Sequence, residues 1–304
     1  MSEKHLFNQD KSGHGLKEVG KEFNHGPWHI EYRLNDGGRL SRISYKDYDL
    51  LTVEPTNFCP PTTDYGQYER RPVFGYDDCF PSLGSCCFPG TKIYIPDHGE
   101  ICWLTWELLE KPRSLEFFVK SKILPLAFKR KMVFTDSSII WNFEVFNESH
   151  ARLPFQHVMH PLYQLDKIKS IELPEFQSAF DWIKGQNMNS LSPGKMRELL
   201  LGQPLGSARM LYLRNIKTGE LSWTYFNRMC LKVKFPLKFF PTIGIWWNNS
   251  GYPEQDGICR TECSFEPTAG FSGILSQGYE DGNCMSVDPG GFFSWQIRWE
   301  MEIN

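Results

Sequence analysis

Short runs of aromatic and branched apolar residues, separated by glycine and proline turns, recur along almost the whole sequence. Aromatic residues make up 15% of the chain, and its 25 glycines and 20 prolines are spread throughout. Such runs are rich in the side chains that fit a pleated surface, and turn residues bound them at short intervals. The pattern therefore predicts an all-β protein with few short helices.

Alternation and turn chemistry place several strands along the chain. The sequence Asn-Asp-Gly-Gly at 35–38 predicts a hairpin between strands at 28–34 and 43–51. A second hairpin is expected around the turn Lys217-Thr218-Gly219, between strands at 208–215 and 221–226. Further strands are expected at 101–109, 115–119, 130–135, 139–145 and 292–301.

Other stretches have different signals. Ser192 is a candidate N-cap, Pro193 suits a first helical turn and Gly202 suits an end, which predicts a helix over 193–201. Six prolines in 54–90 predict a long irregular loop. The polar residues 1–22 are expected to be flexible. Because no linker or repeat is evident afterwards, 23–304 is predicted to be a single domain.

Charge and cysteine usage narrow the possible partners. The 33 basic and 36 acidic residues are nearly balanced, which disfavours nucleic-acid binding. No run approaches the roughly 18 apolar residues of a membrane span, and the polar beginning does not resemble a signal peptide. Nine cysteines without zinc-like spacing fit buried, reduced thiols. We therefore expect a cytoplasmic protein without bound metal, nucleic acid or membrane; its oligomeric state stays open.

Two residues are candidates for proton transfer. His160 precedes Pro161, and proline restricts the preceding residue to extended geometry, which limits where the imidazole points. An imidazole held in this way suits a general acid. Glu266 stands beside Phe265 before Pro267, where apolar neighbours can raise a carboxyl pKa and make it a base. The alternatives are a purely structural histidine and an exposed strand-end glutamate.

Other polar and aromatic residues are candidates for contacts with a ligand. The turn Pro96-Asp97-His98-Gly99 holds a second imidazole, and tryptophans follow it at 103 and 106. Aromatic faces beside polar groups suit sugars, although tryptophans also fill cores and paired aspartates also form turns. The candidate substrate-binding residues are His98, Asp77, Asp78, Arg39, Trp106, Trp247 and Asn248.

The order of these motifs resembles the galactose mutarotase-like (aldose 1-epimerase) family. The resemblance rests on a His98-Gly99 turn, a strand leading to His160-Pro161-Leu162-Tyr163, and Phe265-Glu266-Pro267 near the end. Gly38-Arg39 looks like the opening hairpin of the family, and Asp288-Pro289-Gly290 like its closing turn. The similarity covers roughly 28–301.

The resemblance implies a β-supersandwich of large antiparallel sheets, with a sugar lying across the concave sheet. It also implies that His160 protonates the ring oxygen, that Glu266 removes the anomeric proton and that His98 holds a hydroxyl or the ring oxygen. Such chemistry needs no cofactor. This chain has Thr268 where the galactose branch usually has Gln, and its sugar-binding segments differ. A divergent branch is therefore expected, with no implied sugar specificity.

The leading hypothesis is an aldose 1-epimerase-like isomerase of carbohydrate metabolism, acting on a small sugar. A different isomerisation, or a β-elimination on a uronic acid, could use the same pocket. A non-catalytic carbohydrate-binding protein is the third possibility, because tryptophans 103, 106, 246 and 247 would serve binding equally well. The sequence leaves open which sugar is bound and whether it is phosphorylated.

Overall fold

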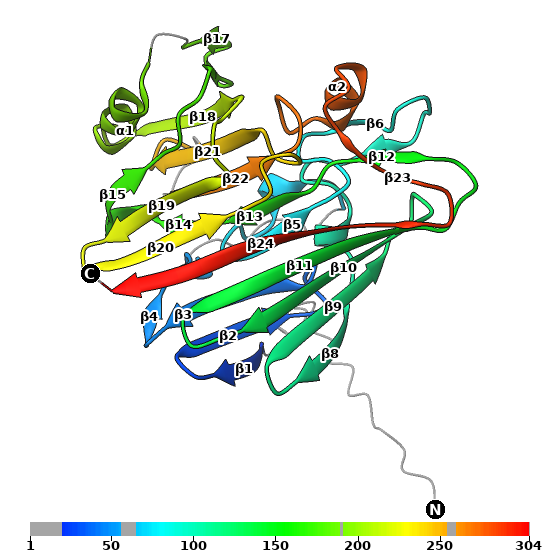
Figure 1. The fold of residues 1–304 in the computed structure, drawn as a ribbon, viewed down its shortest axis with the longest axis horizontal. Coiled ribbons are helices and arrows are strands. Elements are labelled where there is room, and N and C mark those ends of the chain that lie inside the picture. The colour runs from blue at the N-terminus through cyan, green and yellow to red at the C-terminus, as the bar shows by residue number, and fades with distance from the viewer. Residues whose placement is uncertain (1–19, 56–64, 189–190, 254–259, 304) are drawn as a thin grey trace, which may run out of the picture.

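The computed structural model describes residues 20–55, 65–188, 191–253 and 260–303. Its largest element is an eight-stranded antiparallel sheet that crosses the view of Figure 1, with β24 near its centre. In spatial order the strands are β15 (Ile168–Glu172), β19 (Glu220–Tyr225), β20 (Met229–Lys234), β24 (Phe292–Ile303), β11 (Ser138–Asn147), β10 (Leu126–Phe134), β9 (Ser114–Lys120) and β8 (Glu107–Lys111).

Two six-stranded antiparallel sheets carry the rest of the architecture. The first contains β1 (Lys21–His25), β2 (Trp28–Arg33), β3 (Arg39–Tyr45), β5 (Tyr76–Cys79) and β13 (Val158–Pro161), with β4 (Tyr48–Asp49) paired to β3. The second contains β14 (Tyr163–Gln164), β22 (Thr261–Thr268), β21 (Thr242–Asn249), β18 (Ser207–Arg214), β16 (Ser178–Asp181) and β17 (Gln186–Asn187).

Small elements complete the described fold. Two short ribbons pair β12 (Leu153–Phe155) with β23 (Met285–Val287) and β6 (Cys86–Cys87) with β7 (Tyr94–Ile95). The helices are α1 (Pro193–Leu201) and α2 (Leu275–Glu280), with 3₁₀ turns η1 (Tyr68–Arg70), η2 (Ile101–Trp103) and η3 (Leu165–Lys167). No helix in the described part of the chain is both long enough and apolar enough to cross a membrane.

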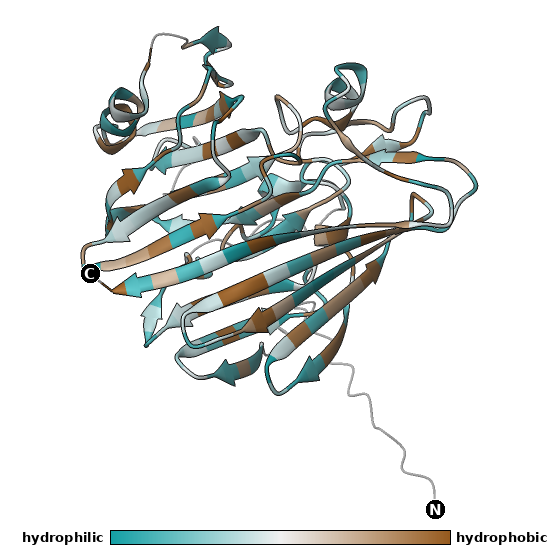
Figure 2. Ribbon diagram, viewed as in Figure 1, coloured by the Kyte–Doolittle hydropathy of each residue, from teal (hydrophilic) through white to brown (hydrophobic). Residues whose placement is uncertain are grey.

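Alternating burial explains how the eight-stranded sheet contributes to the core. Along β11 every second side chain is fully buried, and the same alternation appears along β24 and in the banding of Figure 2. The inward side chains, among them Trp141, Phe143, Trp295 and Trp299, belong to one apolar cluster that also includes residues of both six-stranded sheets. The prediction of an all-β chain with few short helices is confirmed.

Several local predictions are confirmed. The hairpin turn at 35–38 joins β2 to β3, and Gly37 and Gly38 both have positive φ there. At Gly37 a Cβ would lie 2.1 Å from the carbonyl oxygen of Cys102, so only glycine fits. Helix α1 spans the predicted residues, and the Ser192 hydroxyl caps it by accepting from the Lys195 N–H at 3.4 Å.

Other local predictions were wrong. The strand predicted at 43–51 starts earlier, at Arg39, and ends at Tyr45, because Lys46 and Asp47 turn the chain with positive φ. The strand predicted at 101–109 begins with η2, where the Trp106 indole N–H donates to the Ile101 carbonyl at 2.9 Å, and β8 starts only at 107.

The second predicted hairpin was also wrong, although both of its strands form. β18 pairs with β16 and β21, whereas β19 pairs with β15 and β20 in the eight-stranded sheet. The connection between them therefore leaves one sheet and enters the other, and within it the Ile216 N–H donates to the Pro241 carbonyl at 3.1 Å. Strand alternation shows which face is buried, but it does not show which strand is the partner.

Two segments contain structure that the sequence did not indicate. The predicted loop at 54–90 includes β5, whose four residues are all buried, and α2 begins at an Ile274 N-cap that offers no side-chain acceptor. The predicted flexible segment lies outside the described residues up to 19, and its last two residues begin β1.

Candidate functional site

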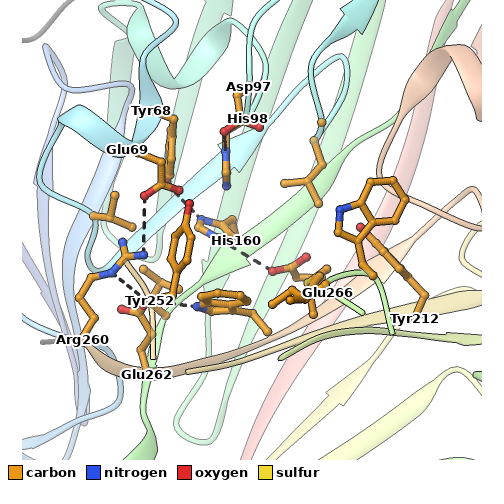
Figure 3. A pocket seen from close by; sticks show the side chains of 18 of the residues that line it. Tyr68, Glu69, Asp97, His98, His160, Tyr212, Tyr252, Arg260, Glu262 and Glu266 are labelled. Carbon is orange, nitrogen blue, oxygen red and sulfur yellow. Dashed lines mark hydrogen bonds and ion pairs between the residues drawn. The ribbon is translucent and has the colours of Figure 1, made fainter. Parts of the chain in front are cut away.

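A cavity of about 360 Å³ opens where the two six-stranded sheets meet, beside β13 and β22. Loops and strands far apart in sequence contribute to it, as Figure 3 shows. The lining residues are Tyr68, Glu69, Val73, Leu83, Gly84, Asp97, His98, His160, Leu162, Trp182, Ile183, Met210, Tyr212, Trp246, Tyr252, Arg260, Glu262, Glu266 and Ile274.

Strand pairing brings the candidate acid and base to this cavity. In the first sheet β13 pairs with β5, and His160 stands opposite Asp77. In the second sheet β22 pairs with β21, and Glu266 stands opposite Gly244. Because β13 and β22 are themselves in contact, His160 Nε2 and Glu266 Oε1 come within 4.0 Å of each other.

His160 is held from behind by a buried carboxylate. Its Nδ1 lies 2.9 Å from Asp77 Oδ1, and the Tyr68 hydroxyl donates to Asp77 Oδ2 at 2.8 Å. Burial alone would lower the pKa of His160, but the hydrogen bond and negative charge of Asp77 outweigh burial and raise it. The same contacts, with the nearby Arg39 guanidinium, hold the pKa of Asp77 well below its usual range despite burial. His160 therefore favours its protonated form.

Glu266 has the opposite environment for a carboxylate. Its side chain is 2% exposed, and burial raises its pKa in spite of the His160 charge nearby. Its Oε2 has no hydrogen-bond partner among the described residues. A Cβ at Gly244 would lie 3.1 Å from this oxygen, so the glycine leaves the carboxylate its space. Glu266 is thus a poorly solvated carboxylate with a free oxygen, which suits a general base.

His98 approaches the same point from a loop. It adopts a left-handed conformation at φ 60°, stacks flat on Tyr68 at 3.6 Å and lies 4.9 Å from the His160 ring. Its Nδ1 is 3.0 Å from Asp97. At the next residue, Gly99, a Cβ would be 2.2 Å from the Phe80 carbonyl oxygen, so this turn requires glycine. The loop therefore presents an imidazole edge beside the acid and base.

The cavity has one charged end and one apolar end. At the charged end Arg260 Nε lies 3.3 Å from Glu262 and its Nη2 lies 3.8 Å from Glu69, while the Trp246 N–H donates to Glu262 at 3.1 Å. Figure 3 shows this group on the opposite side of His160 from Glu266 and Tyr212. At the other end Tyr212 packs edge-on with Trp182 at 6.1 Å, and further apolar lining residues are Leu83, Ile183, Met210 and Ile274.

The structure also brings together three groups that could ligate a metal ion. Ligand atoms of Asp77, Cys79 and His160 all lie within 4.8 Å of one another, and all three residues are buried. Burial and the neighbouring carboxylates raise the pKa of the Cys79 thiol well above its ordinary value, so it stays protonated. Since metals bind the thiolate, and Asp77 already holds His160, this group fits a hydrogen-bonded support better than a metal centre.

Of the predicted substrate-binding residues, His98 lines the cavity and the others stand behind it or elsewhere. Asp77 and Arg39 form the buried support beneath His160, where their side chains are 3.7 Å apart. Asn248 is also buried and holds Glu262 and the Tyr252 carbonyl through its amide. The predicted direct contact of these three residues with the substrate is therefore corrected: they lie behind the cavity and hold residues that line it.

Asp78, Trp106 and Trp247 require a stronger correction. Strand alternation turns Asp78 away from Asp77, so that it contacts the buried Arg130 and His157. Trp106 packs against the same Arg130, with its ring centroid 4.9 Å from the guanidinium carbon. Trp247 faces Phe265 in the core, whereas its neighbour Trp246 lines the cavity. These three residues are parts of the core.

Sequence reasoning missed other members of the site. Tyr68 lies in the segment predicted as irregular loop, and Arg260 follows an undescribed stretch; neither has a recognisable spacing to the catalytic candidates. Glu262 is different, because strand alternation over 262–266 puts its side chain on the same face as that of Glu266. That signal was sufficient to find it.

Comparison with solved structures identifies the architecture. The chain superposes on the Slr1438 protein from Synechocystis with TM-score 0.73 and 13% identity, over 98% of this chain and 100% of that one. It superposes on a putative aldose 1-epimerase from Escherichia coli K12 with TM-score 0.71 and 14% identity, over 94% of this chain and 99% of that one. The chain has the galactose mutarotase-like fold.

A third solved structure with this fold agrees. The galactose mutarotase related enzyme from Lactobacillus acidophilus matches with TM-score 0.66 and 15% identity, over 93% of this chain and 97% of that one. No protein-family model matches the sequence, and no curated protein is significantly similar to it. The resemblance seen in the sequence is thus confirmed as a shared galactose mutarotase-like fold at low identity, as expected of a divergent branch.

Proposed function

We propose that this protein is an aldose 1-epimerase-like isomerase of carbohydrate metabolism, which interconverts the anomers of a small sugar. The observation that carries the proposal is the 4.0 Å separation between His160 Nε2 and Glu266 Oε1 at the base of the cavity. The ring oxygen and the anomeric hydroxyl are bonded to the same carbon of an aldose. An acid and a base that act on both must therefore reach two neighbouring atoms, which a pair in one small cavity can do.

The reaction balances with these two groups alone. Protonated His160 donates from Nε2 to the ring oxygen, while ionised Glu266 takes the proton of the anomeric hydroxyl. The bond between C1 and the ring oxygen breaks, and C1 becomes a carbonyl carbon. After rotation about C1–C2, neutral His160 and protonated Glu266 reverse the transfer, and ring closure gives either anomer. Asp77 keeps His160 protonated and oriented at the start of each cycle.

His98 supports the same cycle from the other side. Its ring lies 4.9 Å from that of His160, within reach of a hydroxyl group or ring oxygen placed over the acid. The solved neighbours described as a putative aldose 1-epimerase and a galactose mutarotase related enzyme share the fold that builds this arrangement. A cytoplasmic location agrees with the free thiols of the described cysteines.

The test is magnetisation-exchange NMR on a panel of reducing sugars with wild-type protein, Glu266→Gln and His160→Gln. Loss of a positioned general acid or base should lower the rate by roughly 10²–10⁴-fold. Glu144→Gln, at a partly exposed position on β11 outside the cavity lining, is the matched control and should keep the wild-type rate. Failure of the wild type to accelerate any sugar, or full activity of Glu266→Gln, would refute the proposal.

Ultraviolet absorbance distinguishes the proposed anomer exchange from the alternative reaction, a β-elimination. A β-elimination on a uronic acid would create a carbon–carbon double bond, and the product would absorb in the ultraviolet. Anomer exchange leaves the absorbance unchanged. The same samples should therefore be followed by absorbance, and growth of an ultraviolet band would replace the isomerase with a lyase.

A further inference from the structure

Carboxylates outnumber cations around the cavity. Glu69, Asp97, Glu262 and Glu266 line it, whereas Arg260 is the single arginine among the lining residues described and no lysine is among them. The lining histidines are His98 and His160, and each stands beside an aspartate, at 3.0 and 2.9 Å. The cavity thus offers an anion little uncompensated positive charge.

Arg260 is already occupied by the protein itself. Its side chain is 12% exposed, and it is held between Glu262 and Glu69 with its guanidinium over the Tyr252 ring at 5.7 Å. A phosphate or carboxylate on a sugar that approached Arg260 would have to face the carboxylates of Glu69 and Glu262 at close range. In a partly buried site such like-charge contacts are strongly unfavourable.

The opposite end of the cavity suits an apolar group. Tyr212 lies beyond Glu266 in Figure 3, its hydroxyl engaged with the Gly273 N–H at 3.3 Å, so its ring is what the cavity meets. Trp182 packs edge-on against that ring at 6.1 Å. Trp182 and Ile183 are 42% and 52% exposed, which is unusual for such large apolar side chains beside an active-site cavity.

We propose that the pocket selects an uncharged sugar that carries an apolar substituent, a deoxy methyl or an acyl group, and rejects sugar phosphates and uronic acids. This proposal rests on the proposed isomerase function and specifies its substrate class. The sugar ring lies over His160 and Glu266, its hydroxyls face Glu69 and Glu262, and its apolar substituent covers Trp182, Ile183 and Tyr212.

The test is a set of matched sugars: glucose, 6-deoxyglucose, N-acetylglucosamine, glucose 6-phosphate and glucuronate. Exchange NMR gives kcat/KM for each, and quenching of tryptophan fluorescence in Glu266→Gln gives binding without turnover. Burying one or two methyl-sized groups should make the deoxy or acetamido sugar about tenfold better than glucose. The phosphate and the uronate should be at least tenfold worse. The substituted sugar with the higher kcat/KM shows whether the apolar group is a deoxy methyl or an acyl group.

Two variants test the two halves of the proposal. Trp182→Ala should raise KM for the preferred substituted sugar several-fold more than for glucose, and Leu205→Ala, at an 80% exposed position outside the cavity lining, is the control. Glu69→Gln should relieve part of the penalty against glucose 6-phosphate.

Each outcome has a distinct meaning. Efficient turnover of glucose 6-phosphate or glucuronate would overturn the proposed selection and leave the isomerase intact. An equal effect of Trp182→Ala on all the sugars would overturn the role of the apolar end. Absence of turnover for every sugar, with preferential binding of the substituted ones, would instead refute the isomerase.

Discussion

Two Asp–His pairs stand side by side in this protein and behave differently. Asp77 pairs with His160, and the next residue, Asp78, pairs with His157; each contact is 2.9 Å. His160 faces the cavity and Glu266, whereas His157 is enclosed by Phe128, Phe143 and Trp295. The alternation of β5 sends one carboxylate to the site and the other into the core.

Burial and the charges around each pair explain the difference. Burial is the largest cause that lowers the pKa of His157, and the positive charge of Arg130, which binds Asp78, adds to it; together they outweigh the hydrogen bond and charge of Asp78. Burial also acts to lower the pKa of His160, but the hydrogen bond and charge of Asp77, with smaller contributions from Glu266 and Glu262, outweigh it and raise the pKa. An Asp–His contact therefore does not by itself define a proton-transfer group; burial and the other charges around the pair help to decide which protonation state the imidazole keeps.

The largest expected effect breaks the core pair. Arg130 is fully buried against Phe117 and Trp106, and its Nη2 donates to the Gly38 carbonyl at 2.6 Å. Arg130→Met removes the partner of a buried carboxylate and should cost about 3–5 kcal/mol of stability. Urea unfolding measures this against Lys129→Met, the half-exposed neighbour on β10. Equal midpoints for both variants would show that the Asp78 group contributes little to the core.

A second substitution breaks the pair at the cavity. Asp77→Asn removes the charge that raises the pKa of His160, so the protonated acid should be lost at lower pH. In the proposed mechanism the active form needs protonated His160 and ionised Glu266, which gives a bell-shaped profile. We expect its basic limb to move to lower pH and the rate above neutrality to fall about tenfold or more. Asp78→Asn should leave that limb in place; if both variants move it equally, the two pairs are not separable.

The sequence indicated several residues of the two pairs, but not which aspartate faces the cavity. His160, Glu266 and the two aspartates were recognised, because proline junctions and adjacent carboxylates are local patterns. Which aspartate faces the cavity depends on the pairing of β5 with β13, which joins residues about 80 positions apart. Since β5 lies in a proline-rich segment, nothing local indicated even that it was a strand.

The same limit applied to the fold. Hydrophobic alternation predicted many of the longer strands, while partner choice between sheets, as for β18 and β19, depends on packing that no local pattern contains. Two adjacent tryptophans illustrate this limit: Trp246 lines the cavity, whereas Trp247 is buried in the core.

The smallest expected effect is a difference in how stability responds to pH. The unfolded chain protonates histidine near pH 6.5, whereas folded His157 resists the proton because its pKa is lowered and its Nδ1 has no partner among the described residues. Stability should therefore fall as the pH drops below about 6.5, by at most about 1.4 kcal/mol per pH unit from this group.

His160 should contribute with the opposite sign. Its folded pKa is raised, so its contribution is fully present below about pH 6.5 and is lost as the pH rises through the folded value. Urea midpoints between pH 5 and 8 should show a flatter acidic side for His157→Gln and a flatter basic side for His160→Gln. Parallel curves for the two variants would mean that both imidazoles keep the same protonation state in the folded protein, and the contrast between the two pairs would then have to lie in their access to the cavity alone.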